Sequence, residues 1–401
     1  MTTTGIARSL LHGPWRAVPV LGVTQIVAWG AIFYTPVLIV PQIAAERGWS
    51  IAFAMGGFSL GLLTAGIAAR TIGASIDRLG GHITMTCGSL AGALGLALIT
   101  LAASPAAYYA VWILLGAAMG ASLYDAAFAS LGRIFGMGAR RPITALTLAG
   151  GFASTVSWPM THLLIDSIGW RGCYLVYAAA LALVNAPLHA FLLPRTRHAA
   201  DMPTPDTRAT PKPTTLLPAR GLIFLLVASA FASYAFVPSG LSAHLLAIFQ
   251  RDGIDAGTVV WIGALFGPAQ VIARLIEFAF GRDLHPIWIA RAAFGALLVA
   301  FALLALTGIT TLTAAVFALM FGGANGLVTI ARGAVPLSLF GASGYGKLMG
   351  RLAAPFLLVQ SAAPLVMAFV VEKISDAAAL ALAAAFAAVA FLCAILIRRP
   401  A

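Results

Sequence analysis

Charged residues are scarce in this chain. Only 9% of its 401 residues are Asp, Glu, Lys or Arg, whereas 61% are hydrophobic. A soluble domain carries about 25% charged residues, and a chain with so few would expose large apolar patches to water. The composition therefore excludes an ordinary soluble fold and indicates a lipid environment.

Residues for metal, disulfide and nucleotide sites are also lacking. Cys87, Cys173 and Cys393 form no C-x-x-C pair, and no two of the seven histidines lie at ligand spacing. This pattern argues against a zinc site or a disulfide framework. No G-x-x-x-x-G-K-[ST] motif occurs, so ATP is not the direct energy source. We expect no cofactor and no metal. The net charge of +12 does not indicate a nucleic-acid partner, because the basic residues cluster in short loops.

Long apolar runs are what the sequence does contain. A helix needs about 20 apolar residues to cross the hydrocarbon core, whereas barrel strands alternate over roughly ten residues. The runs predict twelve transmembrane helices: Val18–Val40, Ile51–Thr71, Thr84–Ala103, Ala107–Ser130, Ile143–Ile165, Gly172–Leu193, Gly221–Leu246, Ala256–Phe280, Ile287–Gly308, Thr311–Ala331, Met349–Val371 and Asp376–Ile397.

Lysine and arginine predict the orientation. Of the 24 Lys and Arg residues, 19 fall on the side of the N-terminus, four fall on the other side, and Arg274 lies within a span. Positive residues accumulate in cytoplasmic loops. We therefore expect both termini in the cytoplasm and a multi-pass plasma membrane protein, as in a bacterial inner membrane.

One proline-rich stretch divides the chain. Residues 194–218 contain six prolines and several charges, and they have too little apolar surface to fold. We expect an N-terminal six-helix bundle at 1–193, a cytoplasmic linker at 194–218 and a C-terminal six-helix bundle at 219–401. The halves echo each other at an offset of 205, because Ser50 and Asp255 are both plausible N-caps before a span.

The loop after the second span resembles a known family signature. It reads Gly73-Ala-Ser-Ile-Asp77-Arg78-Leu-Gly80-Gly81 and is similar to the G-x-x-x-D-R-x-G-(R/K) loop of the major facilitator superfamily, with Gly81 in place of the second basic residue. The resemblance implies two six-helix bundles and secondary transport by alternating access. It also implies that Asp77 and Arg78 join a charge network between the halves. A polar turn with a positive-inside arginine is the alternative.

The eighth span resembles one branch of that family. Gly48-Trp49-Ser50 before the second span and Arg274 in the eighth look most like the monocarboxylate and oxalate–formate carriers. Gln270, Arg274 and Glu277 share one helix face, and a guanidinium binds a carboxylate through two parallel hydrogen bonds. Arg274 is thus a candidate anion-binding residue. The alternative is that it forms an ion pair with Glu277 that only stabilises the end of the helix. The resemblance implies that further pathway residues come from the first, seventh and tenth spans: Trp29, Tyr34, Tyr234 and Asn325.

Asp125 and Glu277 are the candidate proton carriers. Few acids fall inside the predicted spans, and a carboxylate held away from water can exchange a proton near neutral pH. Asp125 would pair with Arg133 or with Arg274. The alternative is a structural hydrogen-bonding role near the helix end.

The sequence therefore predicts a transporter that functions as a monomer. Its expected substrate is a small organic anion, moved together with protons. Proton-driven efflux of a drug or metabolite is the alternative, because Gly150-Gly151 and Trp158-Pro159 in the fifth span resemble a motif of proton-driven exporters. An integral membrane enzyme would need a nucleophile, base or metal constellation, and a channel would need rings of like charge. The sequence shows neither.

Overall fold

The computed structural model describes residues 13–195, 217–242, 244–281 and 284–397. Within these ranges the chain folds into helices joined by short turns, with no β-strand. A helix satisfies its backbone N–H and C=O groups within its own segment, as the hydrocarbon core requires. The all-helical fold class is confirmed.

The first half of the described chain supplies six crossings. Its elements are η1 (Pro14–Arg16), α2 (Ala17–Ala28), η2 (Trp29–Tyr34), α3 (Pro36–Arg47), α4 (Ile51–Leu79), α5 (Gly81–Leu101), α6 (Pro105–Ser122), α7 (Tyr124–Phe135), η3 (Gly136–Ala139), α8 (Arg140–Gly150), α9 (Ala153–Ala180), η4 (Leu181–Asn185) and η5 (Leu188–Leu192).

The second half supplies the other six. Its elements are α10 (Leu217–Leu241), α11 (Leu245–Arg251), α12 (Ala256–Ala264), α13 (Phe266–Phe280), α14 (Pro286–Thr307), α15 (Thr311–Phe340), α16 (Tyr345–Lys373) and α17 (Asp376–Leu396).

Twelve crossings follow from the lengths of the helical segments. Ten segments of the described chain are long and apolar enough to cross a bilayer, and one of them, Pro105–Leu192, has 88 residues. That segment is broken at Gly136 (φ 55°) and Gly169 (φ 72°), in a backbone region that favours glycine. It therefore contains three crossings, and the total is twelve.

The predicted helix boundaries agree best with the structure where the sequence offers an N-cap residue. Ser50 accepts a hydrogen bond from the Phe53 amide at the start of α4, and Asp255 accepts one from the Thr258 amide at the start of α12, so both predicted caps are confirmed. Hydrogen bonds from the side chain and backbone of Thr258 lower the pKa of the Asp255 carboxyl. Helix α15 runs nine residues beyond the predicted end at Ala331.

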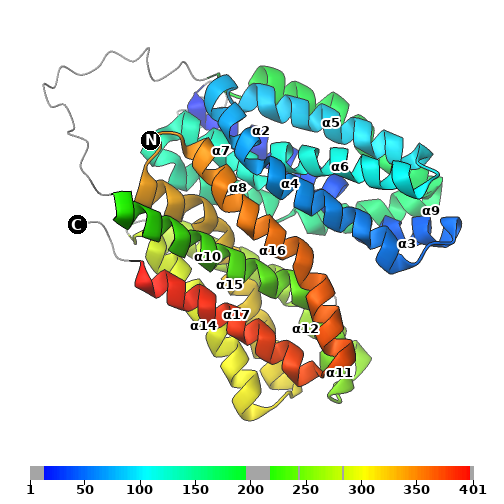
Figure 1. Ribbon diagram of the computed structural model, residues 1–401, viewed down its shortest axis with the longest axis vertical. Helices are drawn as coiled ribbons and strands as arrows, with labels where there is room; N and C mark the ends of the chain where they lie inside the picture. The colour runs from blue at the N-terminus through cyan, green and yellow to red at the C-terminus, as the bar shows by residue number, and fades with distance from the viewer. Residues whose placement is uncertain (1–12, 196–216, 243, 282–283, 398–401) are drawn as a thin grey trace, which may run out of the picture.

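The crossings form two groups that meet at one end (Figure 1). The groups diverge toward α3 in the first half and α11 in the second. At the meeting end, which we call the terminal side, Ala17 and Leu193 share a buried cluster with Leu337 and Tyr345. Helix α4 packs on α16, and α8 packs on α13 and α15. Residues 196–216 of the predicted linker lie outside the described residues.

An ion pair repeats in the two halves with its signs reversed. Glu46 at the end of α3 pairs with Arg171 in α9, and Arg251 at the end of α11 pairs with Asp376 at the start of α17. Adding 205 to the numbers of the first pair gives the second, which matches the offset of the sequence repeat. Exposed ion pairs contribute only about 0–1 kcal/mol to the stability of a fold. These two pairs are therefore evidence of the internal repeat and add little to stability.

Candidate functional site

A break interrupts each of the first, fourth, fifth and eighth crossings, and the break in the fifth lies directly against a buried arginine. A polypeptide that spans lipid tolerates such breaks where protein or a cavity covers them, and broken helices line the binding sites of many transporters. The breaks are the π-helical segment η2, Leu123 between α6 and α7, Gly151-Phe152 between α8 and α9, and Leu265 between α12 and α13.

Arg274 on α13 is the buried charge beside the break in the fifth crossing. Its side chain is only 4% exposed. Nη1 donates to the Thr147 carbonyl at 2.8 Å, across the interface between the halves. Longer contacts of 3.4–3.5 Å reach the Gly326 carbonyl, Gln270 Oε1 and Thr329 Oγ1. All four partners are neutral, and no ion pair of the described residues includes Arg274.

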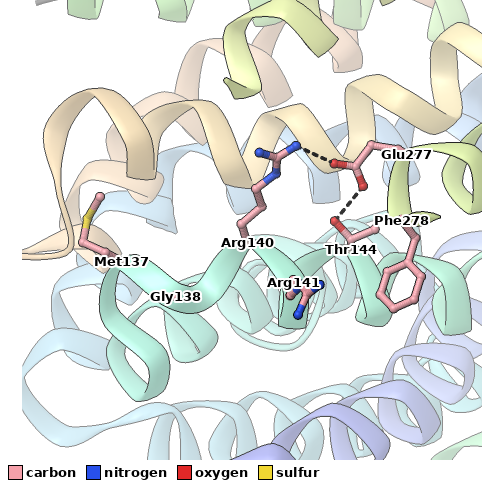
Figure 2. A pocket seen from close by; sticks show the side chains of 7 residues that line it. All are labelled: Met137, Gly138, Arg140, Arg141, Thr144, Glu277 and Phe278. Atoms are coloured by element: carbon pink, nitrogen blue, oxygen red, sulfur yellow. Dashed lines mark hydrogen bonds and ion pairs between the residues drawn. The ribbon is translucent and has the colours of Figure 1, made fainter. Parts of the chain in front are cut away.

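Glu277 does not neutralise Arg274. One carboxylate oxygen lies 2.9 Å from Arg140 Nη2 on α8, and the other accepts a hydrogen bond from Thr144 at 3.1 Å. Figure 2 shows these two residues pointing toward Glu277 at the edge of a cavity of about 280 Å³. Arg140 also donates to the Gly281 and Leu284 carbonyls. The alternative in which Arg274 pairs with Glu277 is therefore wrong, because Glu277 instead joins the two halves at the terminal side.

The aromatic residues of the first half gather beside Arg274. The Trp29 ring centroid lies 5.0 Å from that of Tyr124 and 6.0 Å from that of Tyr34. Both tyrosines interact electrostatically with Arg274. Trp29 donates to Gln25 Oε1 at 3.1 Å, and Gln25 donates to the carbonyl of Ser122, next to the break in the fourth crossing. Tyr124 was not predicted from the sequence.

The second half contributes Tyr234 and Asn325. The Tyr234 hydroxyl donates to Asn325 Oδ1, and this tyrosine interacts electrostatically with Arg274 and Arg332. The structure thus brings Arg274 together with Gln270, Tyr34 and Tyr234. Trp29 contacts the ring of Tyr34, and Asn325 accepts a hydrogen bond from Tyr234, so both belong to the same group of residues.

Asp125 forms an ion pair between the halves. Its Oδ2 lies 2.6 Å from Nη2 of Arg332 on α15, whose guanidinium carbon lies 3.6 Å from the centre of the Phe356 ring. Asp125 Oδ1 is buried and has no hydrogen-bond partner among the described residues. The predicted pairing with Arg133 or Arg274 is wrong. Arg332 was missed because its charge ended the apolar run that predicted the tenth span.

The signature loop contacts the start of α16. The two carboxylate oxygens of Asp77 accept hydrogen bonds from the Gly346 and Lys347 amides, each at 2.8 Å. A helix N-terminus carries partial positive charge and unpaired N–H groups, so it suits a carboxylate. A Cβ on Gly73 would overlap the Gly346 carbonyl, which shows how closely α4 and α16 cross. Arg78 is exposed.

Glycine 80 and Gly81 turn the loop into α5. Gly80 has a φ of 93°, a conformation that other residues adopt at a cost. A Cβ on Gly81 would overlap Ser130 Oγ on α7. Gly81 stands where the family signature usually has a second basic residue, and α5 and α7 pack too closely at this position for a larger side chain.

The sequence matches the Major Facilitator Superfamily over residues 21–342. The chain belongs to the major facilitator superfamily. The resemblance of the Gly73–Gly81 loop is thereby confirmed at the level of the superfamily, and the protein is a membrane transporter of this fold. No curated protein matches it in sequence.

Solved structures of the superfamily share the fold at low sequence identity. The human organic anion transporter MFSD10 (TETRAN) is 18% identical with a TM-score of 0.73, covering 95% of this chain and 99% of that one. FucP in the outward conformation is 14% identical, with a TM-score of 0.69 and coverage of 96% and 99%. The proton:xylose symporter XylE is 13% identical, with a TM-score of 0.66 and coverage of 94% for both chains.

Proposed function

We propose that this major facilitator protein transports a small organic anion, of the monocarboxylate type, together with protons. The observation that carries the proposal is the buried guanidinium of Arg274, whose four hydrogen-bond partners are all neutral. A buried charge without a counter-ion costs several kcal/mol. An anionic substrate supplies that counter-ion. Arginine suits the task because its planar fork binds a carboxylate through two hydrogen bonds.

The surroundings of Arg274 fit a small organic anion. Tyr34, Tyr124 and Tyr234 add apolar ring surface near the guanidinium, and Tyr34 and Tyr124 also add hydroxyl groups. Trp29 extends this aromatic wall, while Gln270 and Asn325 add amide groups from the second half. A binding site made of apolar walls and a few polar groups is typical of small-molecule ligands. MFSD10, which shares the fold, is described as an organic anion transporter.

Alternating access explains the contacts at the terminal side. The halves are joined there by Asp77 of α4, which accepts hydrogen bonds from α16, and by the Arg140–Glu277 pair. Figure 1 shows the halves diverging at the other end. We propose that the terminal side is cytoplasmic, following the excess of Lys and Arg, and that the described state is closed toward the cytoplasm. In this account residues 1–193 and 219–401 rock as two bundles around Arg274, within a monomer in the plasma membrane.

Asp125 is proposed as the proton-carrying group, while the contacts of Glu277 favour a role in the closed state. A proton on Asp125 would remove the charge that holds Arg332 and so loosen the contact between the halves. The buried Oδ1, which has no partner in the described part of the chain, is a place for that proton.

Changing Asp125 to Asn is expected to uncouple transport from protons. The variant should keep exchange of substrate across proteoliposomes, because exchange needs no net proton movement. Uptake driven by an imposed pH gradient should fall to the level without a gradient. Asp166→Asn is the matched control, since Asp166 is an exposed acid. A pH response equal to that of the unchanged protein in Asp125→Asn would contradict the assignment.

Changing Gly151 to Ala tests the position of the Arg274 guanidinium. A Cβ at residue 151 would overlap Arg274 Nη1, which is the end of a flexible side chain and can move. We expect a folded protein whose affinity for a carboxylate falls roughly tenfold, or about 1.4 kcal/mol. Gly267→Ala is the control, because Gly267 has open space around it. Unchanged binding in Gly151→Ala would show that the guanidinium position is not needed.

A thermal-shift screen of the purified protein tests the substrate class. The ligands are carboxylates, phosphorylated metabolites and amphiphilic drugs. A ligand at 100 times its Kd stabilises a protein by about 2.7 kcal/mol, so a substrate should raise Tm clearly. We expect carboxylates to do so and to show saturable counterflow in proteoliposomes. Stabilisation by amphiphilic drugs alone would favour efflux and overturn the anion proposal.

A further inference from the structure

A half-buried cation, Arg291, lies apart from the residues around Arg274, on helix α14 of the second half. Helices α14 and α17 enclose a groove of about 470 Å³, lined by Trp288, Arg291, Ala292, Phe391 and Ile395. Arg291 is the only charged residue among them. Trp288 and Ile395 are each about half exposed, at 49% and 48%. The groove therefore opens toward the surrounding lipid and has apolar walls.

Arg291 is held in this groove by neutral groups. Its Nε donates to the Ala394 carbonyl at 3.0 Å, and Nη2 donates to the Ile395 and Ile397 carbonyls at 3.1 and 2.9 Å. The Ala394 and Ile395 carbonyls belong to the last turn of α17, where carbonyls have no partner within the helix, and Ile397 is the C-cap residue. The Trp288 ring centre lies 4.7 Å from the guanidinium carbon. Nη1 makes no hydrogen bond within the described part of the chain, and no ion pair of that part includes Arg291.

The position along the helices places this cation near a membrane boundary. Arg291 follows Pro286, the first residue of α14, by five positions, which is about 8 Å along the axis. The residues that it caps end α17 on the same side. Tryptophan is enriched at the membrane interface, and Trp288 lies three residues before Arg291 on α14. These features suit a guanidinium at headgroup depth that lines a groove with apolar walls.

We propose that the groove binds an anionic phospholipid from the leaflet on the terminal side. The phosphate accepts hydrogen bonds from Arg291 Nη1, as arginine forks favour for phosphate. One acyl chain runs along Ala292, Phe391 and Ile395. A headgroup with net negative charge is favoured over phosphatidylcholine, because a choline group brings its own cation close to Arg291. The proposal stands apart from the transport proposal, since it concerns a different face of the molecule.

Native mass spectrometry of the full chain tests this site. The protein is purified from detergent containing equal amounts of phosphatidylglycerol and phosphatidylcholine, and the bound lipids are measured. We expect phosphatidylglycerol adducts to exceed phosphatidylcholine adducts in the unchanged protein. Arg291→Gln removes the charged donor, so it should lower the preference roughly tenfold, or by about 1.4 kcal/mol. Arg291→Lys should keep part of it, and Arg195→Gln, an exposed terminal-side arginine, should keep all of it.

A second variant removes the groove without touching the cation. Because Arg291 also caps α17, its loss could weaken the fold. Ala292 is exposed at the groove, so Ala292→Trp should fill the acyl site and lower lipid retention while the protein remains folded. Equal adducts in the unchanged protein and both variants would overturn the proposal. Displacement of phosphatidylglycerol by millimolar inorganic phosphate would overturn it as well, since it would indicate a site for free anions.

Discussion

Changing Arg274 to Gln is expected to abolish carboxylate binding and transport. Loss of one partner from a buried charged contact costs about 2–5 kcal/mol, which corresponds to a roughly 30-fold to several thousand-fold weaker Kd. Glutamine keeps the length and a hydrogen-bonding end but removes the charge. The carboxylate-induced rise in Tm and the saturable counterflow should both disappear.

Two controls separate this effect from damage to the fold. Arg274→Lys retains the charge without the planar fork, so it should bind the carboxylate more weakly than arginine and more tightly than glutamine. Arg171→Gln removes an exposed guanidinium that pairs with Glu46 and should leave binding unchanged. Without ligand, the Gln variant should be at least as stable as the unchanged protein, because it no longer buries a charge that has no counter-ion among the residues the structure describes. Carboxylate binding at full affinity in Arg274→Gln would remove the proposed site.

Changing Gly346 to Ala is expected to open the terminal side. A Cβ at this position would overlap the Gly73 carbonyl and lie 2.6 Å from Asp77 Oδ1. Backbone cannot move aside as a flexible side chain can, so α4 and α16 must separate. Overpacking costs about 1–3 kcal/mol, and the two hydrogen bonds of Asp77 with α16 would weaken as well. The closed state should therefore lose most of its population, and transport should fall at least about tenfold.

Hydrogen–deuterium exchange measures this opening directly. Amides in the first turn of α16 and the last turn of α4 should exchange faster in Gly346→Ala than in the unchanged protein. Gly138→Ala is the matched control on the same side of the membrane, because a Cβ on Gly138 meets nothing within 4 Å. Exchange and transport equal to those of the unchanged protein in Gly346→Ala would show that the close crossing does not hold the closed state.

Much of the fold was predictable because lipid imposes a simple rule on length and polarity. The predicted span Ala256–Phe280 coincides with α12 and α13 together, since charges and turn residues bound it on both sides. The predicted break near Gly308 is also confirmed, because α14 ends at Thr307 and Gly308 has a φ of 76°. The interruptions at Leu123 and Leu265 were not predicted, because they leave hydropathy unchanged.

The pairing of charges could not be predicted from the sequence. The spacing of Arg274 and Glu277 places them on one helix face, yet Glu277 pairs with Arg140, more than 130 residues away. Arg332 carries a charge within an otherwise apolar helix, so hydropathy ended the span just before it and hid the partner of Asp125. Such pairs depend on which helices of the two halves meet, which local patterns do not specify.

A structure of the protein with a bound carboxylate tests the central claim most directly. The ligand is the carboxylate that gives the largest thermal shift, and the protein is the unchanged full chain, imaged by electron cryo-microscopy. The account predicts that both carboxylate oxygens lie within hydrogen-bond distance of the Arg274 guanidinium, with Tyr34, Tyr124 and Tyr234 around the ligand. Density for the ligand elsewhere, with Arg274 still bonded only to Thr147, Gly326, Gln270 and Thr329, would contradict it.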